Sequence, residues 1–362
     1  MASHVPFMTI APTSDDAQIQ DSTIPITSDS LREPSALTSK RRSSTSATDA
    51  IASTIMPAKV TRIPAWVRFP LAVILTLGLS ATLSNFVPEI AGYELAAVSR
   101  SLNEPWQIGG LVGFRVFVIA VAWSMGLDYF DLFNLGILAN VPYYAFLLTF
   151  LETPYLAMAL EFGINLISLA LPFFLLRPLN AHNAAINKPL SVNQAVAADS
   201  PIRLYMAIFA ATVYSLLVYS SFYTWLPVHL VTHFDTIKTL ELAHNAVLPI
   251  MIIASVPIGY AAEAFLFTAS TAHPRSVSDK AFNPATATLG QTIKWNMGLK
   301  SARETVLAQR TLFLAAFTAL NTMVRVWGTI EGSEPWGAAG WAGIFTVAAL
   351  TTGAGYAWIG DV

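Results

Sequence analysis

The sequence predicts an all-α integral membrane protein, a polytopic bundle of about eight transmembrane helices with both termini cytoplasmic. Three observations lead to this prediction. Of 362 residues, 54% are hydrophobic and only 12% are charged, whereas a soluble domain carries roughly 25% charged residues. The apolar residues recur in blocks of about 20, the length that spans the hydrocarbon of a bilayer. The charges of the connecting loops separate by sign from one loop to the next.

Composition also excludes several classes of function. The chain has no cysteine, which excludes disulfide frameworks, thiolate metal sites, iron–sulfur clusters and cysteine nucleophiles. The net charge of −2 gives no basic excess for nucleic acid. No phosphate-binding loop, dinucleotide fingerprint, nucleophile elbow or zinc-protease motif occurs, which argues against nucleotide-driven pumps and ordinary serine hydrolases.

The chain divides into two parts. Residues 1–62 are polar and rich in serine and threonine, as in the stretch 38–46, and they lack the apolar surface that could offset the entropy of ordering. We therefore expect a disordered tail over 1–62 and the transmembrane domain over 63–362. Eight apolar segments follow the tail, near 65–86, 107–126, 130–151, 154–176, 202–227, 245–269, 307–329 and 336–359.

Loop charges support this count of spans. With the tail in the cytoplasm, the long cytoplasmic loops carry eight bases against three acids, and the opposite loops carry eight acids against two bases. A missed helix would invert every later loop, so the positive-inside rule favours eight spans. The chain shows no convincing internal repeat, which weakens the case for an inverted-repeat transporter.

The few ionisable groups within the spans are the first candidates for function, because such groups are costly in hydrocarbon and usually face the bundle interior. Arg115 and Glu161 lie at similar depths in the outer half of the second and fourth spans, and Asn165 is one turn below Glu161. Arg325 and Asn321 occupy the outer half of the seventh span. These side chains predict a polar pocket in the outer half. The alternative is a structural Arg115–Glu161 pair, and the sequence leaves both open.

Two acids join the last two spans, Glu331 and Glu334, between Trp327 and Trp336. They could close the pocket as acids, because apolar rings that desolvate a carboxyl help it to hold a proton near neutrality. The alternative is an aromatic belt with solvated acids at the membrane interface. We favour the belt for Glu334 and leave Glu331 open.

Three further patterns have both a functional and a structural interpretation. Asp128-x-x-Asp131 could hold magnesium against a diphosphate, but without a second Asp-rich cluster we favour capping of a helix start by Asp128. His229-x-x-x-His233 could bind a metal, but we favour a structural role at the interface and predict no metal site. Glu263, near the cytoplasmic end of the sixth span, could reach the interface.

The last forty residues or so carry a resemblance to a known family. They read Leu320-Asn321-Thr322-Met323-Val324-Arg325-Val326-Trp327, then Glu331-Gly332-Ser333-Glu334-Pro335, and end at Trp358-Ile359-Gly360-Asp361-Val362. With the eight-span plan and the missing diphosphate motifs, they make the chain resemble the fungal polytopic membrane-bound terpene cyclases of meroterpenoid pathways, of the ascochlorin, ascofuranone and macrophorin type.

The resemblance implies acid-initiated, metal-free carbocation cyclisation of a farnesyl or epoxyfarnesyl aromatic in secondary metabolism, an isomerase-type reaction without a cofactor. Glu161 or Glu331 would be the proton donor and catalytic acid. Arg115, Asn165, Asn321 and Arg325 would position the substrate. The expected partners are a lipophilic prenylated substrate, the lipid bilayer and other membrane enzymes of the pathway, in the endoplasmic reticulum.

Two other interpretations stay open at this point. The first is a secondary transporter of a small or lipophilic solute, with Arg115 and Glu161 in the substrate path. The second is a non-catalytic membrane scaffold.

Overall fold

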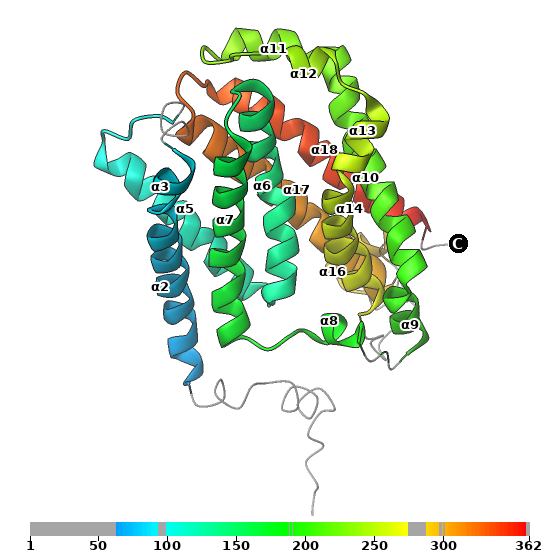
Figure 1. Ribbon diagram of the computed structural model, residues 1–362. Helices are drawn as coiled ribbons and strands as arrows, with labels where there is room; N and C mark the ends of the chain where they lie inside the picture. Colours follow the sequence, from blue (N-terminus) through cyan, green and yellow to red (C-terminus); the bar gives the residue numbers. More distant parts are fainter. Residues whose placement is uncertain are drawn as a thin grey trace, which may run out of the picture. The chain divides into compact units, whose positions relative to one another are not determined.

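The computed structural model describes residues 63–92, 99–187, 189, 191–273, 287–296, 299 and 301–359. The predicted disordered tail, 1–62, lies outside the described residues. The described part contains helices and turns and no β-strand beyond two isolated bridges, which confirms the all-α class. The long helices are α2 (Ala65–Ser84), α5 (Pro105–Ser124), α6 (Tyr129–Phe150), α7 (Tyr155–Leu176), α10 (Ser200–Tyr223), α17 (Ala302–Thr329) and α18 (Pro335–Ile359) (Figure 1).

Short helices connect or extend the long ones. The structure assigns α3 (Val87–Ala91), α8 (Ala181–Ala185), α9 (Val192–Ala198), α11 (Leu226–His233), α12 (Glu241–His244), α13 (Leu248–Ala254), α14 (Val256–Ala262), the π-helix η2 (Glu263–Thr268), α15 (Ala269–Thr271) and α16 (Leu289–Asn296). In Figure 1, α11 and α12 lie at one end of the bundle and α8 and α9 at the other. We call these the α11–α12 end and the α8–α9 end.

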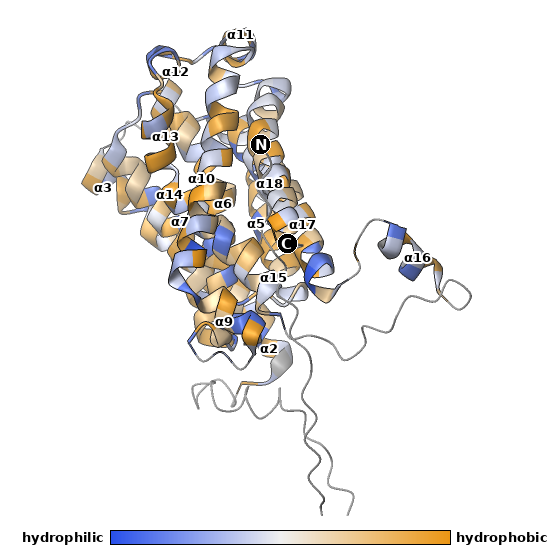
Figure 2. Ribbon diagram, turned by 90° about the vertical axis from the view of Figure 1, so that its right-hand side faces the viewer, coloured by the Kyte–Doolittle hydropathy of each residue, from blue (hydrophilic) through white to orange (hydrophobic). Residues whose placement is uncertain are grey.

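Six of the described helices are long and apolar enough to cross a membrane, and a bent pair would add a seventh if it is one span. The six match predicted segments one to five and eight, with ends that differ by a few residues. Segment seven is also a helix, α17, but it contains more polar side chains and is not among these six. Large apolar side chains lie exposed on helix surfaces, as at Ile74 (66%) and Ile253 (73%), and hydrophobic colour marks much of α10 and α13 in Figure 2. This pattern fits helices that face lipid.

Helix α6 is the centre of the bundle. It packs against α7, α14 and α17. Two thirds (67%) of its most apolar stretch is buried inside the protein, compared with 17% for the spans that contain α2 and α5. Phe146 and Phe150 on α6 meet the ring of Trp341 on α18, which forms an aromatic core near the α11–α12 end. The side chains of α6 are therefore the ones around which the polar sites assemble.

Local sequence sets where these helices begin. Asp128 caps α6, because its carboxylate accepts a hydrogen bond from the Asp131 amide at 2.8 Å. This confirms the predicted capping role of Asp128. Ser301 and Glu304 form a capping box at the start of α17, a Ser-x-x-Glu signature.

The sixth predicted span, 245–269, is broken. α13 and α14 meet at an angle of 52°, and η2 then continues the chain. Pro257 explains the break, since proline in a helix interior lacks a backbone donor and clashes with the preceding turn. Gly259 on α14 then lets the bent helix approach α10, where an added Cβ would lie only 2.1 Å from the Ala207 carbonyl oxygen.

Candidate functional site

A buried polar cluster joins four of the predicted site residues in the half of the bundle nearer the α11–α12 end. We call it the arginine cluster, and it consists of Arg115, Asn140, Tyr144, Asn165, Asn321 and Arg325. Arg115 on α5 donates from Nη1 to Asn165 Oδ1 and from Nη2 to Ser168 Oγ, both at 3.0 Å. Asn165 on α7 donates in turn to the Tyr144 hydroxyl at 2.6 Å. Arg115 is therefore fixed by neutral groups of α7.

Arg325 enters the same cluster from α17. Its Nη1 donates to Asn140 Oδ1 at 2.6 Å and its Nη2 to the Tyr144 hydroxyl at 3.1 Å. Its guanidinium also lies over the ring of Tyr143, 4.1 Å from the centroid. One turn earlier, Asn321 donates to an α6 carbonyl at 2.7 Å. The prediction that Arg115, Asn165, Asn321 and Arg325 lie together therefore agrees with the geometry.

Glu161 lies beside the arginine cluster and forms no ion pair with Arg115, so the Arg115–Glu161 pair left open by the sequence is not found. Its carboxylate accepts a hydrogen bond from the Ser84 hydroxyl and is attracted by the positive charge of Arg325. Its backbone carbonyl accepts from Asn165 Nδ2 at 3.0 Å. The side chain is half-buried, so Glu161 sits at the margin of the cluster.

Glu331 lies apart from the arginine cluster. Its side chain is exposed, and its backbone carbonyl accepts from the Thr236 hydroxyl at 2.8 Å. Glu334 is also exposed and pairs with His233 Nδ1 at 2.7 Å. These two acids tie the α17–α18 connection to the loop after α11. Of the two alternatives left open for Glu331, this geometry favours the exposed acid over closure of the pocket.

The two histidines of the His-x-x-x-His pattern likewise have structural partners. A ring nitrogen of His229 lies 3.2 Å from the Trp336 carbonyl oxygen, and His233 is paired with Glu334. Among the described residues, no three side chains of the histidine, aspartate or glutamate type gather as metal ligands.

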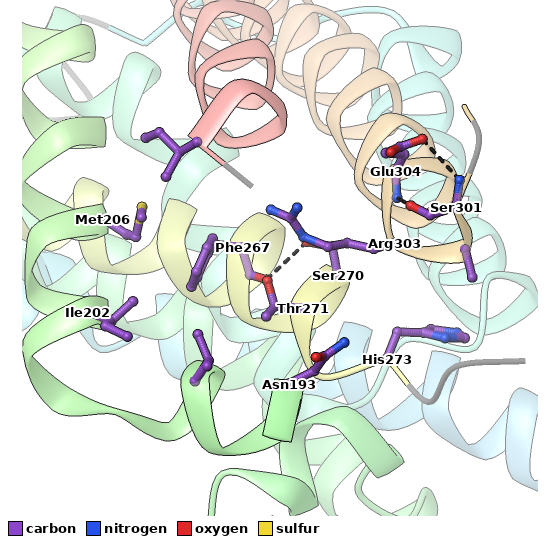
Figure 3. Close-up of a pocket in the computed structure, with 13 residues that line it drawn as sticks. Asn193, Ile202, Met206, Phe267, Ser270, Thr271, His273, Ser301, Arg303 and Glu304 are labelled. Atoms are coloured by element: carbon purple, nitrogen blue, oxygen red, sulfur yellow. Dashed lines mark hydrogen bonds between the residues drawn. The ribbon is translucent and has the colours of Figure 1, made fainter. Parts of the chain in front are cut away.

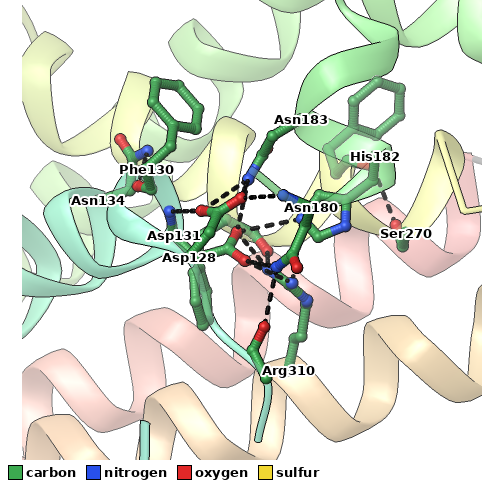
Figure 4. Close-up of polar contacts among 12 residues, drawn as sticks. Asp128, Phe130, Asp131, Asn134, Asn180, His182, Asn183, Ser270 and Arg310 are labelled. Atoms are coloured by element: carbon green, nitrogen blue, oxygen red, sulfur yellow. Dashed lines mark hydrogen bonds and ion pairs between the residues drawn. The ribbon is translucent and has the colours of Figure 1, made fainter. Parts of the chain in front are cut away.

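A second polar network, missed by the sequence interpretation, occupies the α8–α9 end. We call it the aspartate network. Figure 4 shows its members converging from α6, α8 and α17: Asp128, Asp131, Asn180, His182, Asn183 and Arg310. Arg310 binds Asp131 with two parallel hydrogen bonds, Nη1 to Oδ1 at 3.0 Å and Nη2 to Oδ2 at 3.1 Å. Such a fork-to-fork pair is among the strongest polar contacts of a protein interior.

The loop before α8 completes the aspartate network. The Asn180 amide donates to Asp128 Oδ2 at 2.7 Å, and Asn183 Nδ2 donates to the same oxygen at 2.8 Å. His182 Nε2 lies 3.2 Å from Asp131 Oδ1. Burial, together with the Asp131 charge beside it, raises the pKa of Asp128, although these hydrogen bonds oppose the rise. Asp128 therefore caps the start of α6, and both aspartates also hold α6 against the α8 segment and α17.

A second buried charge pair joins α10 to η2. Arg203 Nη2 is 3.2 Å from Glu263 Oε2, and the Thr268 hydroxyl donates to the same carboxylate. The Glu263 side chain is fully buried. The prediction that Glu263 could reach the interface is therefore wrong, because the π-helical turn of η2 holds it against α10.

Cavities lie at both ends of the bundle. One of about 580 Å³ lies beside the start of α17, where Figure 3 shows Arg303 between Ser270 and Ser301. Arg303 Nη2 donates to the Tyr356 carbonyl at 3.1 Å. A smaller cavity of about 200 Å³ lies within the arginine cluster, and one of about 250 Å³ adjoins it between α5 and α17.

One family model matches the chain. It is the model of the bouquet formation protein 3 C-terminal domain, and it matches residues 199–348. The matched segment begins at the residue before α10 and ends within α18, so it contains η2, α17 and the Arg203–Glu263 pair. No curated protein and no solved structure matches the chain.

Proposed function

We propose that this chain is a non-catalytic multi-span membrane scaffold that takes part in bouquet formation. The match of residues 199–348 to the bouquet formation protein 3 C-terminal domain carries this proposal. That segment supplies Arg310 and Arg325, which contribute to both polar networks, so it forms an integral part of the bundle.

The two polar networks support a structural role. Asp131 and Arg310 bind one another across α6 and α17, as Asn140 and Arg325 do nearer the α11–α12 end. Buried polar groups that bind each other in this way fix which helices pack together. A scaffold needs such a fixed arrangement, and it needs no free catalytic acid.

The positions of the two candidate acids give further support. Of the two acids predicted as proton donors, Glu331 is exposed and away from the cavity in the arginine cluster, and Glu161 is at its margin. The terpene cyclase and transporter interpretations stay predictions.

We also propose that the chain crosses the bilayer eight times with both termini cytoplasmic, in the endoplasmic reticulum membrane. The contacts of α17 support the seventh crossing. Arg310 meets Asp131 in the first turn of α6, and Arg325 meets Tyr144 four turns later, so the two helices run side by side in the same direction. Since α6 is long and apolar enough to span, α17 crosses with it.

Deletion of the gene tests the proposed function. Bouquet formation should fail in the deleted cells and return when the full chain is expressed. In parallel, membranes that contain the chain are fed an epoxyfarnesyl phenol, and the products are examined by mass spectrometry and NMR. The scaffold proposal expects unchanged substrate. A cyclised product that depends on the chain would contradict it and would support the cyclase prediction.

A further inference from the structure

The cavity within the arginine cluster and the neighbouring cavity between α5 and α17 share part of their lining. Both are lined by Leu111 and Phe114 from α5 and by Val324 from α17. Their volumes are about 200 Å³ and 250 Å³. We call the combined space the α5–α17 groove. It leads from buried guanidinium groups at its inner end to Trp106 at its mouth, whose side chain is 71% exposed.

The groove is strongly cationic. Three arginines line it, Arg100 at the mouth and Arg115 and Arg325 at the inner end, and no acid is among its described lining residues. Arg115 and Arg325 repel one another, and neither belongs to an ion pair among the described residues. The carboxylate that acts on Arg325 is Glu161, but its hydrogen bond goes to Ser84. One negative charge against two cations leaves the inner end in need of an anion.

A hydrogen-bond donor at the inner end is also unused. Arg115 Nε is buried and has no acceptor. A buried donor without an acceptor costs about 1–3 kcal/mol. A carboxylate has only acceptors, so it complements this arrangement.

The mouth of the groove suits a hydrocarbon chain. Leu111, Phe114 and Val324 form its apolar walls, and Gly110 leaves open space on the α5 side, since an added Cβ there meets no atom within 4 Å.

We propose that the α5–α17 groove binds a single-chain amphiphile with a carboxylate head, such as a fatty acid. The carboxylate lies between Arg115 and Arg325, and the alkyl chain runs along the groove toward Trp106. This site goes beyond the scaffold function proposed above, although Arg325 belongs to both. Oleate binding is measured apart from bouquet formation, so the failure of one proposal is distinguishable from the failure of the other.

Binding of oleate to the full-length protein in phosphatidylcholine nanodiscs tests the proposal. Oleate should bind and saturate, and inorganic phosphate and dioleoyl phosphatidic acid should not displace it. Arg115→Gln should weaken oleate binding roughly tenfold or more, as expected for loss of a charge-assisted hydrogen bond. Absence of saturable oleate binding overturns the proposal. Displacement by phosphatidic acid or by phosphate also overturns it, in favour of a diacyl phosphate lipid or a free anion.

A matched pair of glycine variants keeps the test independent of the arginines. Gly110→Phe places a ring in the groove, whereas Gly109→Phe places the same ring on the neighbouring position of α5, which lines no described cavity. We expect Gly110→Phe to reduce oleate affinity at least tenfold and Gly109→Phe to leave it within about twofold, with equal unfolding temperatures. Equal oleate affinity in the two variants contradicts the proposed position of the chain.

Discussion

At the scale of single residues, the molecule concentrates its charge in a few buried contacts. The Asp131–Arg310 pair is the clearest, because both side chains are at least nine-tenths buried and bind by two hydrogen bonds. Removing one partner of such a pair leaves an uncompensated charge in the interior. The buried charge of the partner that remains then lowers the free energy of unfolding.

Arg310→Met should therefore destabilise the protein by about 3–5 kcal/mol, because Asp131 would stay buried without its cation. Gln309→Met is the control, since Gln309 is the exposed neighbour on α17, and a surface change of this kind stays within about 0.5 kcal/mol. Chemical denaturation in detergent micelles measures both. Similar loss in the two variants would show that the ion pair adds little.

Asp128 gives a prediction about pH. Its pKa is raised in the folded protein, so the folded state binds more protons than the unfolded state above the ordinary value of 3.8. The free energy of unfolding therefore decreases as pH rises through the raised pKa of Asp128, because ionised Asp128 is unfavourable in the folded state. At lower pH Asp128 is protonated and this decrease is absent. Asp128→Asn cannot ionise. The stability of the wild type relative to Asp128→Asn should increase as pH falls from about 7 to about 4. A constant difference would contradict the assignment.

The sequence identified part of these residues and missed the rest for a physical reason. Arg115, Asn165, Asn321 and Arg325 stood out because polar groups are rare in apolar spans. Their partner Tyr144 did not, since an aromatic residue is ordinary in such a helix. The Asp131–Arg310 contact joins residues 179 positions apart, and no local pattern predicts it.

At the scale of helices, apolar length predicted the spans and tertiary contact determined their shape. Segments of about 20 apolar residues became α2, α5, α6 and α7 with ends within a few residues. The break between α13 and α14 was missed, because many membrane helices tolerate proline without a large bend. Here Gly259 lets α14 pack closely against α10 at Ala207.

Gly259→Val should disrupt the contact between α10 and α14. The Ala207 carbonyl oxygen would lie 2.1 Å from the new Cβ, so the helices must separate, and overpacking of this kind costs about 1–3 kcal/mol. Gly163→Val on α7 is the control, because no atom lies within 4 Å of its added Cβ. Thermal unfolding should show a lower midpoint for Gly259→Val alone. A normal midpoint would mean that the close approach is dispensable.

The crossing of α17 can be measured directly, because the chain has no cysteine of its own. Single cysteines are placed by Gly290→Cys before α17 and by Glu331→Cys after it, both at exposed positions. In sealed membranes, an impermeant maleimide should label only one of the two, since eight spans put them on opposite sides. Labelling of both cysteines from one side would show that α17 does not cross the membrane.

At the scale of the whole molecule, the sequence determined the class of protein more firmly than its function. Hydropathy and loop charge are properties of the chain as a whole, so the membrane bundle followed from them. Function depends on where a few acids end up, and that is set by tertiary folding. The sequence left open whether Glu331 closes the pocket, and in the structure its loop contacts the end of α11 and the residues after it.

Complementation by Glu161→Gln tests the central claim of a non-catalytic scaffold most directly. Glutamine keeps the shape of Glu161 and an acceptor for Ser84, but it cannot serve as the proton donor of a cyclase. Bouquet formation is scored in gene-deleted cells that express the wild type, Glu161→Gln or Arg310→Met at matched protein levels. We predict that Glu161→Gln restores it fully and that Arg310→Met does not. Failure of Glu161→Gln together with restoration by Arg310→Met would contradict the scaffold.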